Sequence, residues 1–180
     1  FIQEEYQKEN FEGNFEALTM FVDVSGFTAM TQALMSKGHE GAEILATILN
    51  NVFDLMVNAV YERGGFVSVF AGDAFTAIFP FSNSAIPSDM GVLHVLTCAN
   101  RIQAIFRRHG IQTTPYGQFA LQVKIGISQG RVDWGIIGHT EKTYFFRGEA
   151  IDSCAASEHH ADKGELIFDK QVAPLLRKVP

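Results

Sequence analysis

Two spacings of apolar residues divide the chain into helical and extended segments. Residues 39–65 carry the clearest helical pattern, with apolar side chains at intervals of three and four, as on one helix face: Leu45, Ile48, Leu49, Val52 and Met56. Gly64 and Gly65 follow and predict where this helix stops. A second amphipathic helix is predicted around Val95, Ala99, Ile102 and Phe106. Shorter helices are predicted in residues 26–35, 149–161 and 170–176.

The remaining apolar segments are short and rich in β-branched and aromatic residues. They predict strands in residues 16–24, 66–70, 74–81, 119–128, 131–138, 142–148 and 164–169. The first strand is predicted to be buried and to end at Asp23. Residues 71–73 predict a hairpin, and Gln129-Gly130 predicts a turn between the fourth and fifth strands. Two long helices against a sheet with hairpin connections predict an α+β layer architecture, not a doubly wound one.

Composition indicates a single domain with a short lead-in. The 180 residues suffice for one full core, and no break in composition marks a second domain. Residues 1–14 are polar and predict an N-terminal segment that leads into a domain of residues 15–180. Residues 82–89 predict a loop before the second long helix. The chain starts at Phe1 without an initiator methionine, which is consistent with a piece of a longer protein.

Charge and cysteine content narrow the classes of partner. The formal net charge is −6 and no Lys/Arg cluster occurs, so neither nucleic acid nor a membrane surface is an expected partner. No apolar run approaches the roughly 18 residues that span a bilayer, and no signal peptide precedes the first strand. Cys98 and Cys154 lack a metal-binding or redox spacing, so they predict buried, reduced thiols in a cytoplasmic protein.

Two aspartates, each at a turn, are the candidate chemical groups. Asp23 ends the first strand and Asp73 ends the predicted hairpin turn. If the two strands are neighbours, both carboxylates can hold Mg²⁺ whose coordination phosphate oxygens complete. Two ions roughly 3.5–4 Å apart would hold the attacking and leaving oxygens of a phosphoryl displacement. Residues 26–28 would direct backbone N–H groups at the same phosphates. Taken singly, each motif favours a plainer role, Asp23 as a helix cap and Asp73 as a turn residue.

Together the two motifs resemble a known family. The segments FVDVSGFTAMT (residues 21–31) and ERGGFVSVFAGDAFTAIF (62–79) are similar to the two metal-aspartate segments of the class III nucleotidyl cyclases. The resemblance continues through residues 122–132 and 148–169, and it is strongest to the first catalytic half of the soluble, bicarbonate-responsive adenylyl cyclases. It implies a ferredoxin-like α+β fold with a mostly antiparallel sheet, which works as a head-to-tail dimer with the nucleotide between its halves.

The resemblance also implies site residues and a reaction. Asp23 and Asp73 match the catalytic metal aspartates, Val24 matches a further metal contact, and the implied cofactor is two Mg²⁺ ions that Mn²⁺ can replace. The phosphate-binding positions are matched by Val24, Ser25, Gly26, Phe27, Thr28, Gly72 and Lys124. The implied reaction converts ATP to 3′,5′-cyclic AMP and pyrophosphate.

Four positions depart from the family pattern. In the family the opposite half contributes a Lys, an Asp, an Asn and an Arg to the purine, the ribose and the reacting phosphate, but the matching positions here are Val69, Phe145, Asp152 and Ala156. Loss of a charge-stabilising Arg costs on the order of 10³-fold or more in phosphoryl transfer, so a homodimer is expected to be inactive. The chain therefore resembles a metal-donating half that needs a complementary cyclase domain, on a second chain or on the same longer polypeptide.

Two alternatives stay open for such a half. The purine-selecting residues lie in the other half, so a guanylyl cyclase half is the first alternative. The second is a catalytically silent half for dimerisation or regulation, although two acids in one cleft repel each other unless metal is bound. Bicarbonate binding by the route of the soluble enzymes is not expected, because the matching positions, Val69 and Ala155, carry no charge. Arg147 lies close enough in sequence to keep that question open.

Three other patterns are weaker. His159 and His160 are adjacent and point about 100° apart on a helix, so they are not expected to form a metal site with Asp162. Trp134 and residues 144–146 could stack on a purine, but they alternate along strands as core or dimer-surface residues do. The string DVSGFT faintly resembles the nucleophile loop of haloacid-dehalogenase-type phosphatases, which needs a second Asp where this chain has Ser25.

Overall fold

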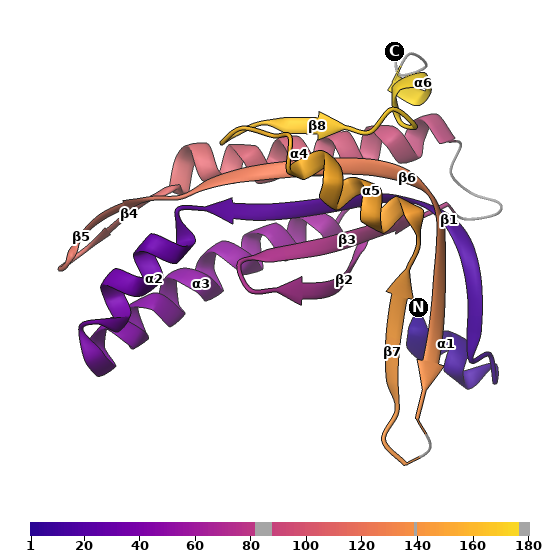
Figure 1. The fold of residues 1–180 in the computed structure, drawn as a ribbon, viewed down its shortest axis with the longest axis horizontal. Helices are drawn as coiled ribbons and strands as arrows, with labels where there is room; N and C mark the ends of the chain where they lie inside the picture. Colours follow the sequence, from indigo (N-terminus) through magenta and orange to yellow (C-terminus); the bar gives the residue numbers. More distant parts are fainter. Residues whose placement is uncertain (82–87, 139, 177–180) are drawn as a thin grey trace.

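The computed structural model describes residues 1–81, 88–138 and 140–176, and a central six-stranded sheet runs through it (Figure 1). Its strands follow the order β2-β3-β1-β6-β7, and β8 pairs with β6 outside this path. Every pair is antiparallel except β6 with β8. The strands are β1 (Glu12–Ser25), β2 (Phe66–Ala71), β3 (Ala74–Pro80), β6 (Gln122–Ile137), β7 (Thr143–Arg147) and β8 (Leu166–Phe168). Strands β4 (Ile111–Thr114) and β5 (Gly117–Ala120) form a separate hairpin.

Within the described residues, six helices accompany this sheet. They are α1 (Ile2–Gln7), α2 (Phe27–Met35), α3 (Gly38–Tyr61), α4 (Ser88–His109), α5 (Glu149–Glu158) and α6 (Ala173–Leu176). The two long helices are the predicted ones, and Gly64 ends α3 with a positive φ of 78°. The predicted α+β fold with a mostly antiparallel sheet is confirmed. The predicted loop at residues 82–89 falls mainly on residues 82–87, outside the described part of the chain.

The alternation of side chains along β1 separates two faces of the sheet. Leu18, Met20, Val22 and Val24 point into the main core, which buried residues of α2, α3 and α4 complete. On the opposite face the buried Thr19 hydroxyl donates a hydrogen bond of 2.7 Å to the Ala150 carbonyl of α5. One face of β1 therefore carries the core, and the other carries α5.

Helix α5 lies very close to β6 because residue 126 has no side chain. A Cβ built on Gly126 would collide with the carbonyl oxygen of Cys154 and lie 2.5 Å from the backbone nitrogen of Glu158. Lys124 shares the face of Gly126, since the two are two positions apart on one strand. The glycine thus sets the C-terminal end of α5 against Lys124.

Two predicted strands are in fact one. Residues 119–128 and 131–138 were expected to be separated by a turn at Gln129-Gly130, but β6 runs unbroken from Gln122 to Ile137. Gly130 pairs with Ala17 of β1, so the ladder continues on both sides of the glycine. Its φ of 151° is a conformation that glycine adopts readily, so the strand bends there without stopping.

The start of the predicted strand at 119–128 is also wrong. Phe119 and Ala120 belong to β5, and Leu121 leaves the ladder to donate to the Gly110 carbonyl at 2.7 Å. The β4–β5 hairpin is held at the other end of the molecule from β7, where the Tyr116 hydroxyl donates to Glu40 of α3 at 2.7 Å (Figure 1). Helix α6 and strand β8 lie inside their predicted segments but are shorter.

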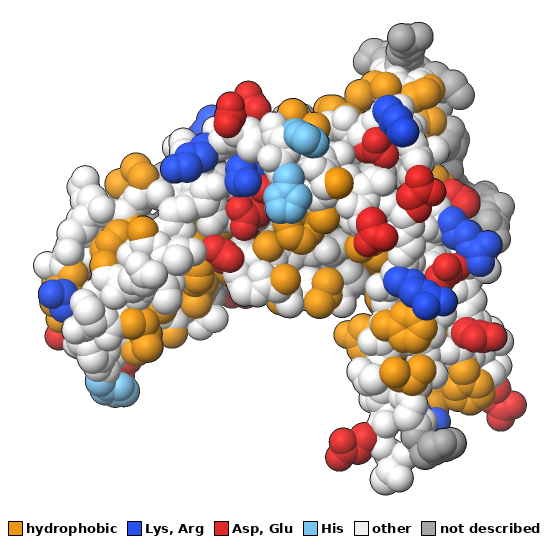
Figure 2. Space-filling view, viewed as in Figure 1, with side chains coloured by type: hydrophobic (Ala, Val, Ile, Leu, Met, Phe, Trp, Pro, Cys, Tyr) orange, Lys and Arg blue, Asp and Glu red, His pale blue; other side chains and the backbone are white. Residues whose placement is uncertain are grey.

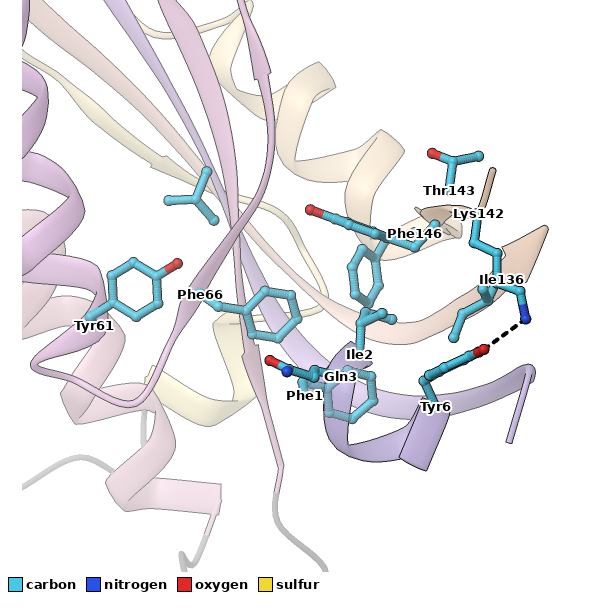
Figure 3. A pocket seen from close by; sticks show the side chains of 12 residues that line it. Phe1, Ile2, Gln3, Tyr6, Tyr61, Phe66, Ile136, Lys142, Thr143 and Phe146 are labelled. Carbon is cyan, nitrogen blue, oxygen red and sulfur yellow. Dashed lines mark hydrogen bonds between the residues drawn. The ribbon is translucent and has the colours of Figure 1, made fainter. Parts of the chain in front are cut away.

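The N-terminal segment holds more structure than its polarity indicates. Residues 2–7 form α1, and residues 12–14 already belong to β1. Helix α1 lies against the arm, which comprises residues 133–138 and 140–147 around the β6–β7 pairing (Figure 1). The Lys142 ammonium donates to the Tyr6 hydroxyl at 2.9 Å, and Phe1 stacks at 5.9 Å on Phe66. These residues line an apolar cavity of about 590 Å³ (Figure 3). The boundary predicted between residues 14 and 15 stays a prediction.

Helix α3 is long and apolar enough to cross a membrane by length and composition, although no apolar run of that kind was expected. Length and composition alone are weak evidence for a membrane span, because the core helix of a folded domain has the same properties. The buried side chains of α3, among them Leu45, Val52 and Met56, belong to the main core.

Both cysteines are buried free thiols, as predicted. Burial raises the pKa of Cys98 to about 12 and that of Cys154 to about 11. Neither thiol is ionised near neutral pH, so neither is a nucleophile. Trp134 is also buried, in agreement with a core role, whereas Tyr144 is half exposed.

Replacement of Gly126 tests the close approach of α5. We expect Gly126→Ala to lower the free energy of unfolding by about 1–3 kcal/mol, the usual range for an overpacked site, because the new methyl group meets backbone atoms. Gly91→Ala in α4 is the matched control, since among the described residues a Cβ there meets Phe81 alone, at 3.5 Å. Urea denaturation of both variants measures the difference, and equal stability would contradict the tight contact.

Candidate active site

The two predicted metal aspartates lie side by side. Asp23, near the end of β1, pairs with Ala74 of β3, and Asp73 stands in the two-residue turn just before Ala74. The Val24 amide donates a backbone hydrogen bond of 3.3 Å to the Asp73 carbonyl. The antiparallel pairing of β1 with β3 is what brings these remote positions together. The hairpin predicted at residues 71–73 is confirmed.

Lys124 supplies a positive charge next to Asp23 through its ammonium group. It stands directly opposite Asp23 across the β1–β6 ladder, and its ammonium nitrogen lies 3.8 Å from Asp23 Oδ2. The same nitrogen forms a closer ion pair with Glu158 Oε1, at the end of α5. Charged and histidine side chains gather over this end of α5 (Figure 2). The structure thus brings Asp23, Asp73 and Lys124 to one place, as the resemblance implied.

Glu158 is the residue that the sequence interpretation missed. Its side chain is only 3% exposed, whereas the neighbouring His159 is 80% exposed. A signal was available, because the buried positions of α5 are Ala150, Cys154, Ser157 and Glu158. That spacing places a carboxylate on the apolar face of a predicted helix, where an acid needs a partner.

The pKa shifts in the site follow from burial and from this crowding of charge. Burial raises the pKa of Asp23 above its ordinary value of 3.8, and repulsion from Glu158 and Asp73 raises it further, while Lys124 opposes the shift. The pKa of Lys124 is raised chiefly by its close ion pair with Glu158. Without a bound cation, the site therefore holds more negative charge than Lys124 compensates.

The glycine turn lies beside the aspartates. Gly26 caps the N-terminus of α2 with a positive φ of 92°, and a Cβ there would collide with the carbonyl oxygen of Ala120. Only glycine therefore fits. No side chain caps this helix, so the first backbone N–H groups of α2, at Phe27 and Thr28, have no partner within the helix. Phe27 packs against the core and Thr28 is exposed. Gly72 sits in the open β2–β3 turn.

The donor set fits a divalent cation that shares its coordination with a ligand. Two carboxylates are present, and across residues 1–81, 88–138 and 140–176 no group of three or more His, Cys, Asp or Glu could hold an ion alone. Mg²⁺ commonly uses one or two carboxylates, with phosphate oxygens and waters in the remaining positions. The uncompensated charge around Asp23 supports the same conclusion.

The four departing positions lie on three elements. Val69 is 54% exposed on β2, and Asp152 and Ala156 are exposed on α5. Phe145 is half-buried on β7, with the Arg147 guanidinium 5.6 Å from its ring centre.

Comparison with known proteins gives the family. Residues 12–179 match the family described as the adenylate and guanylate cyclase catalytic domain. The chain belongs to this family. It is 30% identical over 158 residues to human adenylate cyclase type 10, and this match covers 86% of the chain but 9% of that protein. It is 29% identical over 123 residues to an adenylate cyclase of Anabaena cylindrica, covering 68% of the chain and 22% of that protein. This cyclase domain thus spans a small part of its curated relatives.

Solved structures agree on the fold. The adenylyl cyclase CyaB of P. aeruginosa superposes with a TM-score of 0.67 at 21% identity, covering 93% of this chain and 83% of that one. The guanylyl cyclase domain of the fungus Blastocladiella emersonii gives a TM-score of 0.72 at 15% identity, covering 93% and 87%. The predicted class III cyclase fold is therefore confirmed.

Replacement of Asp23 tests the charge crowding. In metal-free buffer at neutral pH we expect Asp23→Asn to raise the melting temperature by roughly 2–4 °C, the shift that about 1 kcal/mol gives in a domain of this size. The gain should shrink as the pH falls through the raised pKa of Asp23 towards 3.8, because the wild-type carboxyl then becomes neutral in the fold.

Thermal unfolding followed by circular dichroism at several pH values measures this effect. Asp54→Asn, which removes an exposed carboxylate from α3, is the control and should change little. Added Mn²⁺ should raise the melting temperature of the wild type but not that of Asp23→Asn. A variant that melts below the wild type at neutral pH would contradict the charge crowding.

Proposed function

We propose that this chain is the metal-binding half of an adenylyl cyclase, which converts ATP to 3′,5′-cyclic AMP and pyrophosphate together with a complementary cyclase domain. The observation that carries the proposal is the convergence of Asp23, Asp73 and Lys124 at the end of β1. Similarity to adenylate cyclases supports ATP as the substrate. Buried reduced thiols support a cytoplasmic location.

Each predicted residue has a role in this proposal. Asp23 and Asp73, with Val24, would hold two Mg²⁺ ions, for which Mn²⁺ can substitute. These ions would supply charge neutralisation and a lower pKa for the attacking ribose hydroxyl. Lys124 and the backbone of residues 24–28, with Gly72, would bind the triphosphate and orient its α-phosphorus for in-line attack by the ribose 3′-oxygen.

A complementary domain is required because this chain lacks the partner-side residues. Val69 and Ala156 cannot supply the positive charges of Lys and Arg, and Asp152 would repel a triphosphate. The molecule is hollowed between the arm and the lobe of α2 and α3 (Figure 2). Exposed apolar side chains occur on β2, α3 and the arm, as at an interface: Val69, Phe70, Tyr61, Ile137 and Tyr144.

The guanylyl cyclase alternative keeps some support. A receptor-type guanylate cyclase of Caenorhabditis elegans is 23% identical over 156 residues, and the purine-selecting residues would come from the other half. A catalytically silent half has less support. The repulsion around Asp23 lowers the stability of the free chain, and the fold itself does not need these acids.

Restoring the four missing residues in the same chain tests the proposal. We expect the wild-type chain alone to have negligible activity even with Mn²⁺. A V69K/F145D/D152N/A156R variant, as a homodimer, should form cyclic AMP at least 10³-fold faster, the order of the contribution of a charge-stabilising Arg. Adding Asp73→Asn to this variant should lower its rate of cyclic AMP formation about 100-fold or more. Adding Asp54→Asn should leave that rate unchanged.

Chromatographic assay of cyclic nucleotides from ATP and from GTP measures the outcome, and circular dichroism checks that each variant folds. Turnover by the wild-type chain alone would refute the need for a partner. Activity that survives Asp73→Asn would refute the metal role. Should the restored variant stay inactive, Mn²⁺ binding followed by electron paramagnetic resonance, compared between the wild type and Asp73→Asn, tests the metal site directly.

A further inference from the structure

We propose that Glu158 is a positioning residue, which anchors the Lys124 ammonium beside Asp23 and so holds it ready for a triphosphate. For its ligand, this inference rests on the proposed function. The Glu158–Lys124 contact itself does not, because it exists in the free chain.

The contact is built into the fold. Lys124 lies on the β6 face that α5 covers, and Gly126 lets the end of α5 approach until Glu158 meets the ammonium. Glu158 is 3% exposed and Lys124 is 21% exposed. The carboxylate is thus shielded from water, while the ammonium retains an open side.

Glu158 has no second strong cation in the described part of the chain. The nearest alternative, His159, is largely exposed and lies 3.9 Å away from Glu158 Oε2. If Lys124 left, Glu158 would be a buried charge without a close counterion, which is strongly unfavourable. Lys124 therefore stays with Glu158 when ligand binds. An ammonium has three donors, so it can keep Glu158 and still donate to a phosphate oxygen.

Glu158 also keeps Lys124 from pairing fully with a metal ligand. The ammonium lies 3.8 Å from Asp23 Oδ2, which is longer than a hydrogen bond. Without the carboxylate of Glu158, Asp23 is the acid that remains opposite Lys124, so the ammonium would move onto the group that binds the cation. Glu158 thus leaves Asp23 free to bind the metal ion and keeps Lys124 available to the triphosphate.

The first experiment needs no ligand. At constant pH, ¹⁵N–¹H NMR of lysine ammonium groups should show a protected Lys124 signal in the wild type, assigned by its loss in Lys124→Arg. In Glu158→Gln this signal should broaden or vanish through exchange with water, and in Glu158→Asp it should persist. Glu165→Gln removes an exposed carboxylate close to α5 and should leave it unchanged. An unchanged signal in Glu158→Gln overturns the proposal.

The second experiment measures binding of Mn²⁺-tripolyphosphate by calorimetry. Glu158→Gln should weaken binding about 2- to 10-fold, the cost of ordering one long side chain, whereas Glu158→Asp and Glu165→Gln should bind like the wild type. If Glu158 acted only as a repelling charge, Glu158→Gln would bind more tightly, and that result overturns the proposal. If the wild type itself does not bind, the proposed function fails, and the NMR experiment still decides the role of Glu158.

Discussion

The long antiparallel pairing of β1 with β6 is the constraint on which the rest of the structure depends. It runs from Glu12 opposite Gly135 to Ser25 opposite Gln122 without a break in register. Because side chains alternate along both strands, this one register decides which residues enter the core and which face α5. It also puts Lys124 directly opposite Asp23. A slip of one residue would exchange the two faces and dissolve the site together with the core.

Much of this arrangement could be predicted from the sequence, because it depends on local patterns. The periodic apolar residues of α3 and α4, the hairpin at Gly72-Asp73 and the turn at Gly26 are each encoded within a few positions. The convergence of Asp23 with Asp73 required the resemblance to the cyclases, since no local pattern states which strands are neighbours. What the sequence concealed were effects of pairing. Gly130 looked like a turn but lies within a continuous strand, and the partner of Glu158 became evident only once Gly126 had brought α5 onto Lys124.

Electrostatics in the site is unbalanced. Asp23, Asp73 and Glu158 share the site with one lysine, and burial together with repulsion from the other two acids raises the pKa of Asp23. Such crowding costs stability in the free chain and is relieved by a divalent cation. On the arm, by contrast, the Lys142 ammonium packs over the rings of Tyr6 and Phe11.

The two faces of β1 carry different sets of residues, and this separation has a consequence for how the sequences of such domains diverge. Leu18, Met20 and Val22 belong to the core, while Asp23 and its neighbours across the sheet lie on the face that carries the proposed site. Mutations can therefore erase one set of polar groups and leave the architecture intact. In the proposed pairing, two copies of such a domain would be free to specialise, each copy losing the functions that the other retains, and Val69 and Ala156 are the marks such a history would leave.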